Sequence, residues 1–153
     1  MARKSNNTAL NNLCDRLNSV VLDNKLSKTI TFVGTTTGAI TTHALATVTG
    51  VVAVQLFAIC SVDVASAGGT VEVGTADTTA GLIAQTTATE IDAYDIWHDN
   101  SPDASIELTS VLTHKIVSRN VGYKIAGATL TAGAVTFYLM WTPISADGNV
   151  VMA

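Results

Sequence analysis

Charge is scarce in this chain of 153 residues, since Asp, Glu, Lys and Arg make up only 13% of it, against about 25% in an average soluble domain. Residues 1–28 hold five basic and two acidic side chains, and the remainder holds three basic and ten acidic ones. An acidic body argues against nucleic-acid binding. A surface poor in charge suits a protein that packs against other subunits, although a plain soluble β-sandwich also fits this composition.

Cysteine and long hydrophobic runs are also rare. The two cysteines, Cys14 and Cys60, stand in no metal-ligand or redox spacing, so we expect synthesis in a reducing cytosol without disulfides. The longest apolar run, Val51–Cys60, is interrupted by Gln55 and is far shorter than the roughly 20 residues that cross a bilayer. The basic start, MARKSNNT, leads into no apolar segment, so we do not interpret it as a signal peptide. We therefore expect no membrane partner.

Motifs that carry catalysis are missing as well, because GxSxG, Walker A and GxGxxG patterns do not occur. Acidic residues do gather between positions 90 and 103, but their spacing does not match a calcium-binding loop. A solvated acidic loop is the favoured interpretation, and the histidines at 43, 98 and 114 add no zinc-ligand set. We expect no enzyme and no cofactor. The weak candidates for metal ligands are Asp92, Asp95 and Asp99.

The strongest strand signal lies in residues 133–148, GAVTFYLMWTPISADG. Four large apolar residues alternate there with threonine, tyrosine and methionine, and side chains alternate between the two faces of a strand. Pro143 and the Ala-Asp-Gly at 146–148 end the pattern. This stretch predicts a core strand whose inward residues are Val135, Phe137, Leu139 and Trp141.

Further strand signals recur between turn signals along the chain. Residues 51–64 are apolar at nearly every position, which is typical of a strand covered on both faces. Gly68-Gly69 predicts a hairpin turn into a strand at 70–73, and residues 127–133 are expected to form a loop. About eight strands predict an all-β fold, a jelly-roll-like β-sandwich over residues 28–153. The other expected strands are 29–33, 42–49, 106–112, 115–117 and 121–125.

Residues 1–27 are predicted to form a separate N-terminal arm, extended or helical. Apolar residues recur there at helical spacing, which indicates one apolar stripe on a short amphipathic helix. The stripe has two possible partners, the sheet of its own body or a neighbouring chain. The arm residues expected to make the contact with a partner are Arg3, Lys4, Leu10, Leu13, Arg16, Leu17 and Val21.

Three stretches give the chain a family likeness. IDAYDIWHD at 91–99, SPDAS at 101–105 and FYLMWTPISADG at 137–148 resemble small structural virion proteins of tailed bacteriophages, over most of residues 28–150. The resemblance implies a head decoration (cement) protein, commonly a β-rich trimer on the capsid surface, whose partners are the major capsid protein and other copies of itself. A receptor- or glycan-binding fibre or spike head is the alternative, although aromatic residues are few, at 5%.

Overall fold

The computed structural model describes residues 24–99 and 114–153. Within these ranges the chain forms ten strands and one short 3-10 turn, η1 (Ala88–Glu90), so the fold is all-β. No helix in the described ranges is long and apolar enough to cross a membrane. The strands are β1 (Asn24–Thr31), β2 (Thr42–Thr49), β3 (Val52–Ser66), β4 (Thr70–Thr75), β5 (Ile83–Thr87), β6 (Ile96–His98), β7 (Lys115–Val117), β8 (Val121–Ala126), β9 (Leu130–Pro143) and β10 (Asn149–Met152).

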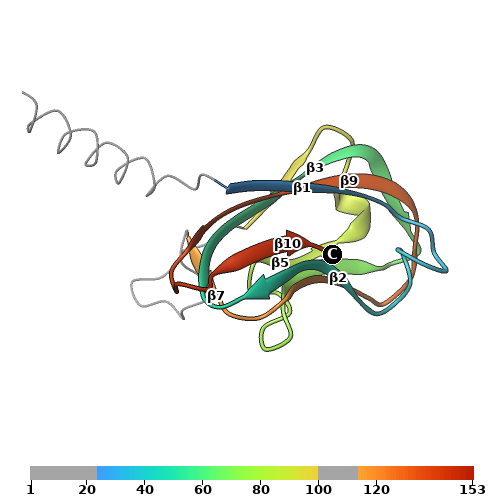
Figure 1. Ribbon diagram of the computed structural model, residues 1–153. Coiled ribbons are helices and arrows are strands. Elements are labelled where there is room, and N and C mark those ends of the chain that lie inside the picture. The colour runs from blue at the N-terminus through green and yellow to red at the C-terminus, as the bar shows by residue number, and fades with distance from the viewer. Residues whose placement is uncertain (1–23, 100–113) are drawn as a thin grey trace, which may run out of the picture.

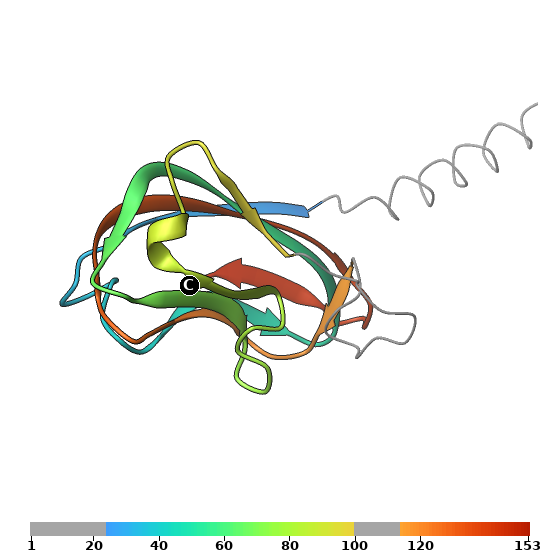
Figure 2. The same ribbon diagram turned by 180° about the vertical axis from the view of Figure 1, so that it is seen from behind.

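The strands form two antiparallel sheets that pack as a β-sandwich. Sheet A has the order β1-β9-β3-β6, and β7 pairs with β3 further along the edge that β6 also occupies. Sheet B has the order β10-β2-β8-β4-β5. In Figure 1, β1, β9 and β3 lie together in one layer and β10, β5 and β2 in the other, and Figure 2 shows the same two layers from behind. The all-β sandwich that the sequence predicts is confirmed, whereas its jelly-roll winding stays a prediction.

The core between the sheets is centred on β9 and β3. The inward residues of β9 are those that the alternation predicts: Val135, Phe137 and Leu139 are 0% exposed and Trp141 is 8% exposed. β3 contributes its own alternate residues from Val52 to Cys60, which pair with β9 along the whole strand. Both strands therefore present one continuous apolar side to sheet B, and this burial supplies the main driving force for folding.

Aromatic rings join the two sheets in the middle of the core. Phe137 of sheet A stacks on Tyr123 of sheet B, with ring centroids 6.1 Å apart, and Trp97 meets Phe137 edge-on at 6.0 Å. The Tyr123 hydroxyl donates a hydrogen bond to the Thr37 carbonyl oxygen. Burial raises the pKa of Tyr123 to about 12, because the charged phenolate is unfavourable away from water. Trp97 Nε1 also donates a hydrogen bond to Thr86 Oγ1 at 2.8 Å. This bond connects β6, at the edge of sheet A, to β5, at the edge of sheet B.

Three expectations about the strands need correction. The turn at Gly68-Gly69 does not make a hairpin, because β3 lies in sheet A whereas β4 pairs with β5 and β8 in sheet B. The expected loop at 127–133 is shorter, since β9 already begins at Leu130, which is 0% exposed. β1 begins at Asn24, so sheet A includes residues that the sequence assigned to the arm.

Candidate interaction surface

The outer side of sheet A is the most distinctive surface of the described chain. Because core residues alternate with outward ones, the strand pairings place a single set of side chains on this side. We call it the A face. It consists of Lys25, Ser27 and Thr29 of β1, Thr136, Tyr138, Met140 and Thr142 of β9, Ala53, Gln55, Phe57 and Ile59 of β3, Ile96 and His98 of β6, and Ile116 of β7.

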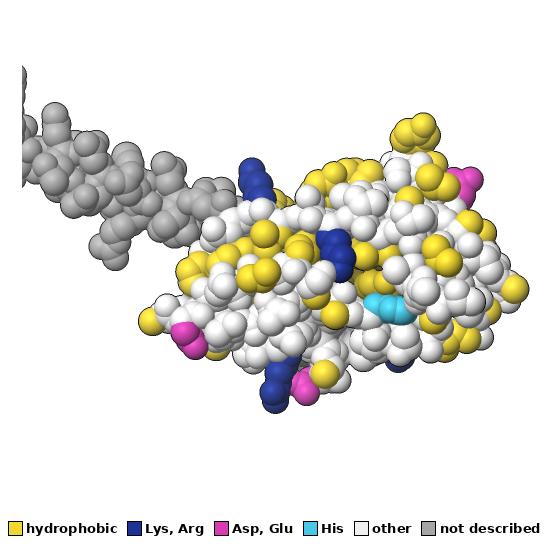
Figure 3. All heavy atoms as spheres, turned by 45° about the vertical axis from the view of Figure 1, so that its right-hand side comes forward, with side chains coloured by type: hydrophobic (Ala, Val, Ile, Leu, Met, Phe, Trp, Pro, Cys, Tyr) yellow, Lys and Arg dark blue, Asp and Glu magenta, His cyan; other side chains and the backbone are white. Residues whose placement is uncertain are grey.

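The A face carries its large apolar side chains on β3, β6, β7 and β9, next to the polar Gln55, His98, Thr136 and Thr142. Ile59, Ile96 and Ile116 are 37%, 62% and 44% exposed. The rings of Phe57 and Tyr138, which are cross-strand neighbours, stack 5.2 Å apart and are only partly buried. Contiguous apolar surface of this kind marks an interaction site more often than scattered single residues do. Figure 3, which views the molecule from another side, shows separate hydrophobic patches on a mostly uncharged surface with few charged side chains.

The outer side of sheet B has a different character. We call it the B face. It is built mainly from threonine, glycine and one ion pair, with Val151 as its exposed large apolar residue. The two outer surfaces therefore differ, because sheet A exposes several large apolar side chains and sheet B exposes mainly small and polar ones. The B face consists of Thr42, Ala44, Thr47, Thr49, Thr70, Glu72, Gly74, Gln85, Gly122, Lys124 and Val151.

The A face is hollowed between β6 and β7. These two short strands pair with different parts of β3, and a hollow of about 390 Å³ opens beside them. Its lining combines outward residues of the A face with the buried end of Lys115. The hollow therefore makes this part of the sheet surface concave. A concave site of this kind can accommodate a protruding side chain of a binding partner.

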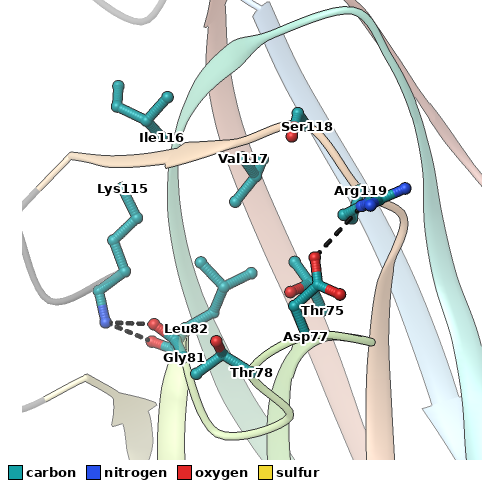
Figure 4. A pocket seen from close by; sticks show the side chains of 10 residues that line it. All are labelled: Thr75, Asp77, Thr78, Gly81, Leu82, Lys115, Ile116, Val117, Ser118 and Arg119. Carbon is teal, nitrogen blue, oxygen red and sulfur yellow. Dashed lines mark hydrogen bonds and ion pairs between the residues drawn. The ribbon is translucent and has the colours of Figure 1, made fainter. Parts of the chain in front are cut away.

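Lys115 is a buried cation at the junction of the two sheets. It is 5% exposed and its Nζ lies 2.5 Å from Asp99 Oδ2 and 2.7 Å from the Gly81 carbonyl oxygen, to which it donates. Figure 4 shows it reaching from β7 towards the carbonyl groups of Gly81 and Leu82. The pair satisfies the charge that burial would otherwise penalise and links β7 of sheet A to the segment before β5 of sheet B.

A second hollow, of about 180 Å³, lies next to Lys115 and is the one drawn in Figure 4. Threonine and serine hydroxyls line it, together with Arg119, whose Nε lies 3.2 Å from Asp77 Oδ2. Both cations of this hollow have carboxylate partners. Its size and paired charges give it no chemistry beyond solvent and small polar contacts.

Glu72 and Lys124 form a cross-strand ion pair on the B face. They are directly opposite in the pairing of β4 with β8, and Lys124 Nζ lies 3.0 Å from Glu72 Oε1. Glu72 is only 6% exposed. Burial pushes the pKa of Glu72 upwards, but hydrogen bonds from Thr79 and Lys124 and the charge of Lys124 outweigh it, so the pKa lies below its usual value of 4.5. The pair thus stabilises the ionised carboxylate.

We expect Glu72→Gln to flatten the acid side of the stability profile. A carboxyl group whose pKa is lowered by folding contributes stability above its unfolded pKa of 4.5, and this stability is lost as the pH falls through the lower folded value. The free energy of unfolding, measured by urea titration between pH 6 and pH 3, should therefore fall less steeply with acid in the variant. Gln85→Ala, which removes an exposed uncharged side chain from the same face, is the control and should leave the slope unchanged. Equal slopes in wild type and Glu72→Gln would contradict the assignment.

The three weak metal candidates do not converge. Asp95 Oδ2 accepts a hydrogen bond from the backbone N–H of Asp92 at 3.1 Å, while Asp99 is engaged by Lys115. Across residues 24–99 and 114–153, no three His, Cys, Asp or Glu side chains are close enough together to hold a metal ion. Of the histidines, His43 stacks on Tyr123 at 4.7 Å. The predicted arm contacts at 3, 4, 10, 13, 16, 17 and 21 lie outside the described residues.

Sequence reasoning did not single out the A face or Lys115. The signal for the A face was present, because Tyr138 and Met140 alternate with the core residues of β9 and Phe57 and Ile59 do so in β3. No comparable signal pointed to Lys115, whose partners come from distant parts of the chain. Comparison of the chain with family models, curated proteins and solved structures gave no match.

Proposed function

We propose that this chain is a structural virion protein that decorates the head of a tailed bacteriophage, where it binds the major capsid protein and further copies of itself. The observation that carries the proposal is the contrast between the apolar A face and the polar B face. A sandwich with one such face is suited to being covered by protein on that side. In this proposal the chain is not an enzyme, a trimer is the favoured assembly, and the protein is made in the host cytoplasm before it joins the capsid surface.

The strand order supports the jelly-roll winding that goes with this proposal. β6 and β7 pair with the same edge of β3, so they can be counted as one position, with β10 set apart as an added edge strand. Numbered in this way, one sheet holds positions 1-8-3-6 and the other 2-7-4-5. A jelly roll, with its two Greek keys, can be described as one long hairpin wrapped on itself. The strand pairs of such a hairpin are 1 with 8, 2 with 7, 3 with 6 and 4 with 5, and these are the neighbours found here.

Binding to empty heads of the corresponding phage tests the proposal. We expect the full chain to co-sediment with heads and to saturate at hundreds of copies per particle. Deletion of residues 2–22 should abolish binding, because the arm adds contact area that the compact body lacks, and circular dichroism should show that the variant keeps its strand content. Full binding by the deletion variant would show that the arm is not the anchor, and only a handful of copies per particle would overturn the decoration role.

A glycan- or receptor-binding head is the second candidate, and the stacked Phe57 and Tyr138 rings favour it. Aromatic faces pack against the apolar faces of sugars, and these rings are partly open to solvent on the A face. The head-binding measurement separates the two functions, since a fibre or spike module is present in few copies and does not bind empty heads. Host-cell binding that is lost in Tyr138→Ala would then favour the second candidate.

A further inference from the structure

We propose that the A face is the docking site for residues 8–21 of a second copy of this chain. The inference rests on the proposed function, since it names what covers the apolar face in the assembled protein. Each chain places its arm on one neighbour and receives the arm of another neighbour on its A face. All arms and all faces are therefore used only when the copies form a closed set. Such a head-to-tail interface closes into a ring when its rotation allows, and this includes the trimer.

The composition of β3 indicates that its outer side is covered by protein. Its sequence is that of a strand buried on both faces, and its inner side meets the core, with Val52, Val54 and Ala58 each 0% exposed. On its outer side, however, Ile59 is 37% exposed, and Phe57 is only half-buried. The strand therefore carries apolar side chains for a second contact that the described part of the chain does not make.

The size of the apolar surface selects a helix over a second sheet. It spans β9, β3 and the β6 and β7 edge, about 15 Å by 20 Å given the spacing of strands and the rise per residue, or on the order of 300 Å². Two A faces packed together would bury this area once per copy, far below the roughly 800 Å² on each partner of a stable interface, whereas in the ring each copy buries both its face and its arm. A helix of 14 residues is about 21 Å long and 10 Å wide, which matches the patch.

Residues 8–21 carry the complementary pattern. The sequence predicts one amphipathic helix there, with its apolar side chains along one stripe and asparagine, aspartate and arginine on the other side. A narrow stripe laid on an apolar strip of sheet buries both and leaves the polar side in water. The stripe residues are Leu10, Leu13, Cys14, Leu17 and Val21.

The position of β1 argues that the occupant comes from another copy. The segment enters sheet A at Asn24, which is the first residue of the edge strand β1 and pairs with Trp141. Val21 precedes it by three residues and so stays within about 10 Å of it. The outward residues of β1 are the exposed Lys25, Ser27 and Thr29, so a helix folded back along the strands of its own sheet would cover polar side chains. The apolar surface begins on β9, next to β1, and its part over β3 and β6 lies two and three strands from β1, about 10–14 Å away.

Two full-length variants, studied without phage heads, test the proposal. The arm variant carries Leu13→Asp and Leu17→Asp, and the face variant carries Ile96→Asp and Ile116→Asp, both at exposed positions. Light scattering after size exclusion should show an oligomer for wild type and monomers for each variant, with self-association weakened about 100-fold or more because two carboxylates would be buried without partners. The matched control, Val151→Asp with Ala44→Asp, places the same charge on the B face and should assemble like wild type.

Mixing the two variants gives the decisive measurement. The face variant still has an intact arm and the arm variant an intact face, so an equimolar mixture should form a one-to-one dimer that neither forms alone. A monomeric wild type would overturn the proposal, as docking on its own sheet predicts. An arm variant that still assembles would overturn it in favour of face-to-face packing. If wild type is monomeric but binds heads, the arm exchange is wrong and the decoration role stands. If wild type assembles but does not bind heads, the arm exchange stands and the decoration role is wrong.

Discussion

Phe137→Ala should lower the free energy of unfolding by about 3–5 kcal/mol, as removal of a fully buried ring typically does. Phe137 is 0% exposed and lies between Tyr123 of one sheet and Trp97 at the edge of the other. Its loss removes the ring that both neighbours contact and leaves a cavity that two rigid sheets cannot close. At about 2–4 °C per kcal/mol for a chain of this size, the melting temperature should fall by roughly 6–20 °C.

The adjacent residue provides the control for this substitution. Tyr138 is on the same strand but belongs to the A face, where its ring is only partly buried and stacks on Phe57. Tyr138→Ala should cost less than about 1.5 kcal/mol, the worth of an aromatic pair. Urea titrations with an unchanged slope for both variants would show that only the folded state is affected. Similar losses at the two positions would contradict the assignment of inward and outward residues on β9.

Lys115→Ala should cost about 3 kcal/mol, near the lower end of the range for breaking a buried ion pair, because Asp99 keeps some contact with water. The substitution removes the ammonium group that lies 2.5 Å from Asp99 Oδ2 and donates to the Gly81 carbonyl oxygen. A double-mutant cycle with Asp99→Ala should give a coupling energy of about 1–3 kcal/mol, as expected for residues in direct contact. Thermal or urea unfolding of the four proteins measures it.

The second ion pair of the same hollow is a built-in comparison. Arg119 and Asp77 are 66% and 67% exposed in their side chains, so Arg119→Ala should change stability by no more than about 1 kcal/mol. Addition of 1 M NaCl should weaken the exposed pair more than the buried one, since salt screens charges that water reaches. A coupling energy near zero for Lys115 and Asp99 would show that burial cancels their attraction.

The sequence predicted the parts of the fold that periodicity controls. The bounds of β2 agree with its prediction, and the inward residues of β9 follow from alternation alone. Periodicity does not determine which sheet a strand joins. It therefore predicts a hairpin at Gly68-Gly69, where the chain instead crosses from sheet A to sheet B. The bounds of β7 also agree with the predicted strand at 115–117, but Lys115 points inward and Ile116 outward, because the partners of Lys115 come from elsewhere in the chain.

The candidate site was less predictable than the fold because it depends on which strands pair, and therefore on which distant residues become neighbours. Phe57 and Tyr138 are far apart in sequence, and only the pairing of β3 with β9 makes them one stacked pair. Helical spacing predicts which arm residues make a contact, but that spacing does not identify the surface they meet. The acidic residues at 92, 95 and 99 illustrate the converse, since closeness in sequence did not bring their carboxylates together.

The pairing of β1 with β9 has a consequence for how the chain is made. Asn24 and Trp141 are pairing partners 117 residues apart, so β1 leaves the ribosome long before the strand it needs. At 5–20 residues per second the wait lasts roughly 6–23 s. During that interval the apolar side chains of β3 are already in solution while β9, their main neighbour, is still being synthesised. We therefore expect nascent chains to depend on chaperone protection, and the last quarter of translation to be the step at which the sandwich closes.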